Sequence, residues 1–189
     1  MLEKLENEAR NCKACGLCAT RINTVFSDGS KNAKIMLIGE APGADEDKQG
    51  KPFVGRAGKL LNEFLKQAGI DRHKDLYIAN TLKCRPPENR KPTKEEKAAC
   101  EKFLKGQIEA LKPSVIVLCG ATAAESFFDK KFQITKIRGE IFDNVKGFEG
   151  IKFIHILHPS YLLRQHSTQE GSPRDLTLKD LIMIKKAAL

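Results

Sequence analysis

The 189-residue chain has no tryptophan, no long hydrophobic run and neither of two common nucleotide-binding glycine motifs. A membrane-spanning helix needs about 20 consecutive apolar residues, and the chain has no such stretch. Its charged N-terminus also lacks the apolar core of a secretion signal. No Gly-Lys-Ser/Thr or G-x-G-x-x-G pattern is present, which excludes a P-loop and a dinucleotide fold. We therefore expect a soluble cytoplasmic protein. Because tryptophan is absent, a ligand that stacks on an aromatic side chain must stack on Phe or Tyr.

Acidic residues are outnumbered, 24 Asp and Glu against 33 Lys and Arg, which gives a formal net charge of +9. A basic surplus suits a polyanionic partner, because neutralising phosphates releases counterions. A solvated basic surface accounts for the charge equally well, so charge alone identifies no partner. The length suits one domain around one core, and we expect a monomer.

Apolar runs alternate with amphipathic stretches along the chain. The expected strands are residues 33–38, 76–79, 115–118, 134–142 and 151–157. Helices are expected over 1–11, 56–68, 120–128 and 176–188, and after Thr93, where Thr-Lys-Glu-Glu is a capping-box pattern. This alternation predicts an α/β domain with a largely parallel central sheet, to which the pair within 134–157 adds an antiparallel edge.

Polar side chains follow three of the expected strands. Glu40 and Asn80 come directly after two of them, and His158 follows the last. Ligands of open parallel sheets bind beyond the carboxyl ends of the strands, so these residues should meet at one edge. Each residue taken singly also fits an ordinary structural role, as a solvated acid, a turn residue or a core histidine. The three together are better accounted for by a binding pocket.

The segment Gly39-Glu40-Ala41-Pro42-Gly43 allows a sharp turn and close backbone approach to a ligand. Phe53 lies further along the same loop, either as an aromatic face for the ligand or as an ordinary core residue. A planar, neutral ligand held by backbone amides and an aromatic ring suits this segment best.

Six cysteines in an intracellular chain favour a metal centre or catalysis over disulfides. One C-x-x-C-x-x-C segment and two distant cysteines are typical of a four-thiolate centre holding either an iron–sulfur cluster or zinc. The candidates are Cys12, Cys15, Cys18, Cys84 and Cys100, while Cys119 follows a buried strand as a core thiol. Spacing alone does not choose four of the five, and a buried free thiol is an alternative for Cys100.

These motifs together resemble the family 4 uracil-DNA glycosylases, the iron–sulfur class found in bacteria and archaea. The matching segments are NCKAC, GEAPGADEDKQGKPFVGRAGKLL, YIANTLKCRPPENR, ITKIRGE and HPSYLLR. The resemblance covers nearly the whole chain. It implies one domain over residues 1–189 with an N-terminal cluster-binding segment, folded as three α/β/α layers around a four-stranded, mainly parallel sheet. The implied activity is base-excision DNA repair: uracil is flipped out of DNA and its N-glycosidic bond is hydrolysed, leaving an abasic site.

The resemblance also assigns residues. It implies a [4Fe–4S] cluster on Cys12, Cys15, Cys84 and Cys100, with Cys18 as the spare thiol. The implied uracil-binding residues are Gly39, Glu40, Ala41, Phe53, Asn80 and His158, of which Glu40 and His158 are the catalytic candidates. The expected DNA-binding residues are Arg85, Arg90, Ser160, Tyr161, Leu162, Leu163 and Arg164. Leu162 and Leu163 are suited either to wedging into the space the base vacates or to anchoring their loop.

Departures from the family pattern leave some assignments with alternatives. Ala41 stands where the family often has glycine, and its methyl group narrows the backbone approach. Glu46 or Asp47 is an alternative to Glu40 in activating water. The inserted Arg-Arg-Ile-His segment of covalently trapping relatives is absent after Lys136 and near His158, so no stable protein–DNA adduct is expected. Two further hypotheses are an inactive nucleic-acid-binding module stapled by a cluster or zinc, and an iron–sulfur electron carrier.

Overall fold

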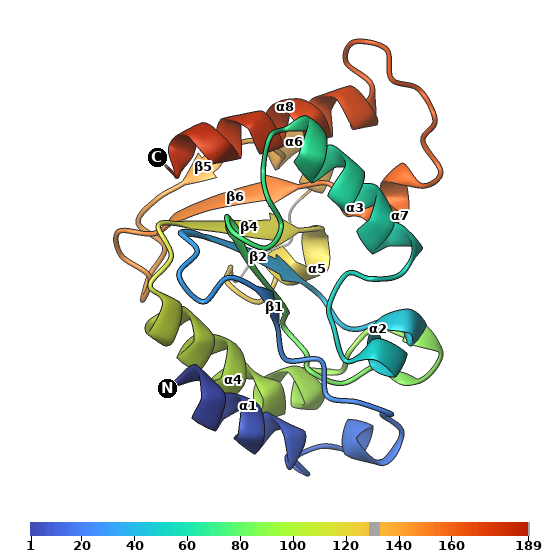
Figure 1. Ribbon diagram of the computed structural model, residues 1–189, viewed down its shortest axis with the longest axis vertical. Coiled ribbons are helices and arrows are strands. Elements are labelled where there is room, and N and C mark those ends of the chain that lie inside the picture. Colours follow the sequence, from blue (N-terminus) through green and yellow to red (C-terminus); the bar gives the residue numbers. More distant parts are fainter. Residues whose placement is uncertain (129–132, 189) are drawn as a thin grey trace.

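A six-stranded sheet with the order β1-β3-β2-β4-β6-β5 separates two layers of helices in the computed structural model, which describes residues 1–128 and 133–188 (Figure 1). The four central strands run parallel: β3 (Leu76–Asn80), β2 (Ile35–Gly39), β4 (Val115–Cys119) and β6 (Lys152–Ile156). Two short antiparallel strands, β1 (Asp28–Gly29) and β5 (Ile141–Phe142), extend the edges. The expected four-stranded parallel centre is confirmed, and the sheet is wider than expected by these two strands.

Five of the helices were expected in outline, whereas those at 44–49, 134–137 and 159–162 were not. The helices are α1 (Leu2–Arg10), α2 (Ala44–Gln49), α3 (Arg56–Gln67), α4 (Lys94–Leu111), α5 (Ala121–Ala124), α6 (Ile134–Ile137), α7 (Pro159–Leu162) and α8 (Pro173–Ala187), with 3₁₀ turns at Gly16–Ala19 and Pro87–Asn89. The capping box at the start of α4 is confirmed. The Thr93 hydroxyl accepts from the Glu96 amide at 3.2 Å, and Glu96 accepts from the Thr93 amide at 2.9 Å.

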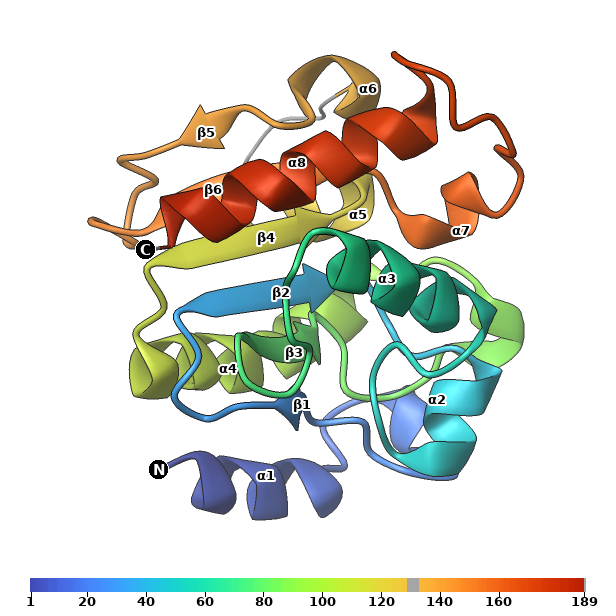
Figure 2. The same cartoon turned by 45° about the horizontal axis from the view of Figure 1, so that its top comes forward.

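Each face of the sheet has its own apolar core. Successive residues of a strand point to opposite faces, so β2 contributes Leu37 to one core and Met36 to the other. The first core packs against α3, α7 and α8, and the second against α4 and α5. Figure 2 shows α3 and α8 on one side of the sheet and α4 on the other, with α1 outside α4. The three-layer α/β/α prediction is therefore confirmed.

Three element predictions are wrong in detail. Residues 134–142 were expected as one strand, but they form α6 and the two-residue β5, because Gly139 turns the backbone through a positive φ of 74° between them. The expected helix over 120–128 lies within the described residues, where α5 ends at Ala124 and Phe127 packs at 5.2 Å from the Phe153 ring. Helix α8 begins earlier than expected, since Ser172 caps it and Pro173 occupies its first turn.

None of the helices in residues 1–128 and 133–188 combines the length and apolar character that crossing a membrane requires.

Candidate active site

A cavity of about 360 Å³ lies at the carboxyl ends of the parallel strands. Its volume is within the range of small-molecule pockets. Side chains from three different strand ends and one loop line it: Glu40, Asn80, His158 and Phe53. Other lining residues are Ala41, Pro42, Gly43, Glu46, Ala57, Pro86, Asn89, Arg90 and Ser160. The expected convergence of these polar residues on one cavity is therefore observed.

Gly39, the last residue of β2, lies tightly against the Asn80 amide and the Phe53 ring. A Cβ atom added there would lie 2.5 Å from Asn80 Oδ1 and 2.7 Å from Phe53 Cζ. Both distances are below normal contact, so the missing side chain is what lets the amide and the ring share this end of the pocket. Gly39 pairs with Asn80 across β2 and β3, which places the two residues side by side.

Asn80 is 3% exposed, yet its side-chain amide makes no hydrogen bond to any other described residue. The amide group and the carbonyl oxygen are therefore both available to a ligand. The backbone of Asn80 is held from behind, because the Lys83 ammonium donates to its carbonyl oxygen at 2.7 Å. Gln107 accepts from the same ammonium at 2.6 Å. A buried polar network thus fixes the strand end that carries the Asn80 side chain.

His158 caps α7 and has a defined proton arrangement. Its Nδ1 lies 3.1 Å from the backbone nitrogen of Ser160 and 2.7 Å from the Ser160 hydroxyl. A backbone N–H only donates, so Nδ1 accepts and the neutral ring carries its proton on Nε2. Burial lowers the pKa of His158, and the nearby Glu46 carboxylate opposes this shift. The imidazole is therefore neutral near pH 7 and its Nε2–H is a donor.

Three acids of the loop, the candidates for activating water, have different surroundings. The Glu46 carboxylate accepts from the backbone amides of Val54 at 2.8 Å and Gly55 at 2.7 Å. Asp47 is 2% exposed and accepts from the amides of residues 22 and 23. The Glu40 carboxylate has no hydrogen-bond partner among the described residues and lines the cavity. Glu46 and Asp47 therefore stabilise loops, while Glu40 is available to a ligand or water.

The structure separates the residues expected to bind DNA. Arg164 and Ser160 are exposed, and Tyr161 and Leu163 are half-buried. Leu162 is 0% exposed within the core below α7, so the wedge interpretation is wrong for Leu162 and the anchoring interpretation is right.

The two arginines of the loop after β3 make internal contacts. Arg90 forms a two-armed ion pair with Glu96, at 2.6 and 2.9 Å. Arg85 donates to Asn89 at 2.8 Å. These contacts order the segment that runs along one wall of the pocket.

Five thiols surround a second, small cavity between α1, the Gly16–Ala19 turn and the start of α4: Cys12, Cys15, Cys18, Cys84 and Cys100. Burial raises the pKa of Cys84, and the thiols of Cys12 and Cys15 raise it further. Burial also raises the pKa of Cys100 to about 11, with the Lys83 ammonium opposing the shift. Cys119 lies apart in the core, as expected. The distant parts of the chain that carry the candidate ligands do meet.

The donors around these sulfurs suit a negatively charged thiolate centre. The Arg21 guanidinium donates to Cys84 Sγ at 3.2 Å, and the Lys83 amide donates to Cys100 Sγ at 3.3 Å. Hydrogen bonds to ligand sulfurs are a usual feature around iron–sulfur clusters. Within the described residues, no three His, Cys, Asp or Glu side chains are arranged to hold a single metal ion. The five gathered thiols and the two donors to their sulfurs fit a thiolate-bound cofactor.

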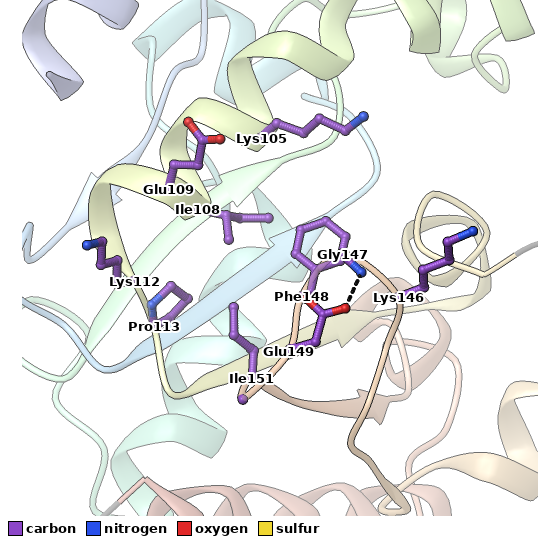
Figure 3. Close-up of a pocket in the computed structure, with 11 residues that line it drawn as sticks. Lys105, Ile108, Glu109, Lys112, Pro113, Lys146, Gly147, Phe148, Glu149 and Ile151 are labelled. Atoms are coloured by element: carbon purple, nitrogen blue, oxygen red, sulfur yellow. Dashed lines mark hydrogen bonds between the residues drawn. The ribbon is translucent and has the colours of Figure 1, made fainter.

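A larger cavity, of about 760 Å³, lies at the amino ends of β4 and β6 (Figure 3). Figure 3 shows Lys105, Lys112 and Lys146 pointing outward from it. Its Glu149 carboxylate accepts from the backbone amide of Gly147 at 3.0 Å. Because no set of polar groups from the described residues converges inside it, we assign the site to the smaller of the two cavities.

Sequence reasoning missed the roles of two cations, the buried Lys83 and the half-buried Arg72. The Lys83 ammonium donates to the Asn80 carbonyl oxygen, and the Arg72 guanidinium donates to the Phe53 carbonyl oxygen. In the sequence, Arg72 lies four residues before and Lys83 four residues after the apolar strand at 76–79. This placement does not reveal a partner, because the partners lie on other elements.

The sequence and the fold of this chain match a known class. The model of the uracil DNA glycosylase superfamily matches residues 26–182, and the chain belongs to that superfamily. The chain is 48% identical to the type-4 uracil-DNA glycosylase of Thermotoga maritima over 182 residues, 96% of this chain and 91% of the relative. It is 42% identical to the type-4 enzyme of Archaeoglobus fulgidus over 178 residues, 92% and 89% of the two chains. For the type-4 enzyme of Sulfurisphaera tokodaii the identity is 44% over 144 residues, 74% and 65%. The resemblance drawn from the motifs is confirmed.

Proposed function

We propose that this protein is a monofunctional DNA repair glycosylase that removes uracil from DNA and leaves an abasic site. The observation that carries the proposal is the meeting of Phe53, Asn80 and His158 around one cavity of about 360 Å³. The type-4 uracil-DNA glycosylase names of its relatives support the same activity.

Base selection falls to Asn80. Its NH₂ group donates to uracil O4 while its carbonyl accepts from N3–H. Cytosine presents the opposite pattern at both positions, so an amide held in one orientation rejects it. Each mismatched buried polar group costs about 1–3 kcal/mol. The hydrogen bond from Lys83 to the Asn80 backbone supports a rigid recognition group.

Bond cleavage places negative charge on the leaving uracil and positive charge on the sugar. The Nε2–H of neutral His158 donates to uracil O2 and stabilises the anion as an oxyanion hole does. Glu40 holds the attacking water and favours the cationic sugar by its charge. Phe53 stacks on the base, which offsets the few kcal/mol needed to extrude it from the duplex.

DNA is held by the exposed end of α7 and its following loop. Ser160 and Arg164 contact phosphates there, and Tyr161 and half-buried Leu163 face the vacated space in the stack. Arg85 and Arg90 contact the DNA backbone from the opposite wall of the pocket. Removing their charges weakens binding to all sequences and reduces its salt dependence.

The thiol cavity holds a [4Fe–4S] cluster on Cys12, Cys15, Cys84 and Cys100. When bound, the cluster acts as a cross-link between α1, the loop after β3 and α4. Arg21 and Lys83 balance its negative charge, and Lys83 also reaches Asn80. A bound cluster would thereby stabilise one wall of the pocket through Lys83.

The activity is tested with a uracil-containing oligonucleotide, incubated with cluster-loaded protein and then with alkali. We expect strand scission at the uracil and none at cytosine in the same position. Intact DNA from folded, cluster-loaded protein defeats the proposal, and tight DNA binding without scission supports the inactive binding module instead.

The cofactor assignment is tested by comparing Cys84→Ser with Cys18→Ser. We expect Cys84→Ser to lose the broad cluster absorption near roughly 400 nm and to unfold at lower temperature. Cys18→Ser retains both, since Cys18 is the spare thiol. Bound iron measured in each purified variant checks the result, and equal iron loss in both variants contradicts the ligand set.

A further inference from the structure

The loop that joins α2 to α3 (Figure 2) carries Phe53, whose backbone conformation is unfavourable. Phe53 has a φ of +52°, in the left-handed region that bulky residues rarely adopt. Its ring is 7% exposed and its centroid lies 6.1 Å from that of His158. A strained loop keeps such a conformation only when its surroundings hold it there, so the contacts of this loop decide where the ring points.

Arg72, on the segment between α3 and β3, holds one side of the loop. Its guanidinium donates to the carbonyl oxygens of Pro52 at 2.6 Å and Phe53 at 3.1 Å. A further N–H donates to Asn62 on α3 at 2.9 Å. Asp28 on β1 pairs with the guanidinium at 3.0 Å and accepts from Nε at 3.1 Å. The Arg72 side chain is 10% exposed, so these contacts are largely shielded from water.

The other side of the loop is held by Glu46 and by a close packing contact. Glu46 accepts from the backbone amides of Val54 and Gly55, which follow Phe53 directly. A Cβ atom at Gly58 would lie 2.0 Å from the Phe53 carbonyl oxygen, so only glycine lets α3 pass this close. The carbonyls before the bend and the amides after it are therefore bound to different elements.

We propose that Arg72 is a positioning residue that locks Phe53 as a rigid stacking face for the extruded base. The inference rests on the proposed function, because the base that stacks on Phe53 is the uracil extruded in that reaction. Arginine is required because one planar fork reaches two successive carbonyls, Asn62 and Asp28 together. A lysine ammonium keeps the pairing with Asp28 but does not span all four acceptors.

The first measurement is hydrogen exchange of the loop amides, which needs no DNA. In Arg72→Met we expect the peptide with Val54 and Gly55 to exchange faster by about ten-fold or more, since a freed loop opens more often. The matched control is Arg138→Met, which removes an ion pair of similar burial with Asp180 on α8. In Arg138→Met, as in the wild-type protein, we expect the Val54 and Gly55 amides to stay protected from exchange.

The second measurement is binding to two oligonucleotides, one with a hydrolysis-resistant 2′-fluoro-deoxyuridine and one with an abasic-site analogue. Because stacking on an aromatic ring contributes to binding of each base, Arg72→Met weakens affinity for the uridine oligonucleotide by about ten-fold. Affinity for the abasic analogue, which has no base to stack, does not change. Arg138→Met changes neither affinity. In a Phe53→Ala background, Arg72→Met brings no further loss.

Normal loop protection in Arg72→Met, or a further loss of affinity on top of Phe53→Ala, overturns the inference. If Arg72→Met does not fold, Arg72→Lys undergoes the same two measurements and is expected to show the same changes at smaller size. A wild-type protein with protected loop amides that releases no uracil defeats the proposed function, while the exchange data still decide whether Arg72 holds the loop.

Discussion

The two cavities at opposite ends of the sheet differ in a way that size does not explain. The larger, about 760 Å³, has three lysines pointing outward and a glutamate bonded to its own loop. The smaller, about 360 Å³, gathers an amide, an imidazole, a carboxylate and an aromatic ring. A binding site is identified by groups that converge on one ligand and have unused hydrogen-bonding capacity, and of these two cavities the smaller meets that test.

The difference follows from the direction of the strands. Four parallel strands bring their carboxyl ends to one edge, where the chain leaves each strand in a loop or helix N-terminus. Residues such as Asn80 and His158 are therefore presented side by side although they are far apart in the sequence. The amino ends receive the chain from α4 and from the loop before β6, and no corresponding set of polar groups among the described residues meets there.

The largest effect is expected from Asn80→Asp in the smaller cavity. A carboxylate does not donate to uracil O4, so we expect uracil release to fall by about 100-fold or more. The measurement is kcat/KM on a uracil-containing oligonucleotide. Its control is Glu109→Gln in the larger cavity, which also exchanges an amide and an acid and is expected to leave kcat/KM unchanged. Equal effects of the two changes would erase the functional distinction between the cavities.

Smaller effects are expected from changing two glycines. One change should lower activity, and the other should lower stability. Gly39→Ala pushes against Asn80 and Phe53, and we expect about a ten-fold loss of activity because a small misplacement of site residues slows the reaction. At Gly147, in the larger cavity, an added Cβ atom would have no described residue within 4 Å, but the backbone there has a φ of +82°. Gly147→Ala should lower stability by about 1 kcal/mol and leave activity intact. Activity assays and thermal unfolding on both variants check these two effects, and wild-type activity in Gly39→Ala contradicts the close packing of the pocket.

The smallest effect is expected in the pH dependence of the unfolding free energy. It should differ between two histidines of the C-terminal part of the chain, His155 and His166. Burial lowers the pKa of His155, in the core, to about 4. An unfolded histidine titrates near 6.5, so the stability from keeping His155 neutral is fully present above that pH and is lost as pH falls toward about 4. We expect His155→Phe to flatten this decline in unfolding free energy and to leave uracil release near neutral pH unchanged. An exposed histidine changed in the same way, His166→Phe, should leave the decline as it is in the wild type.

Much of this fold was predictable because its signals are local. The buried strands at 76–79 and 115–118 are continuous apolar runs, and the start of α4 follows from the capping box at Thr93. The run at 134–142 misled because its apolar residues do not reveal the bend at Gly139, where the neighbouring Arg138 is paired with Asp180 of α8.

The candidate site was predictable in its members but not in its supports. Asn80 and His158 were recognisable from their places after strands. The burial of Leu162 was not, since its outcome depends on how α7 lies against the core. Glu46 and Arg72 were also hidden, because the backbone groups they bind belong to loops whose course the sequence does not specify.

The order of apolar runs and the polar residues that end them determined the layered α/β architecture and the edge of the sheet at which a ligand binds, because strand burial and direction depend on local pattern. Tertiary structure alone decided which acid remains available in the pocket, which leucine is buried, and how the strained Phe53 is held. Those outcomes depend on distances between segments remote in sequence, where hydrogen bonds and packing select one arrangement among many that the same local pattern permits.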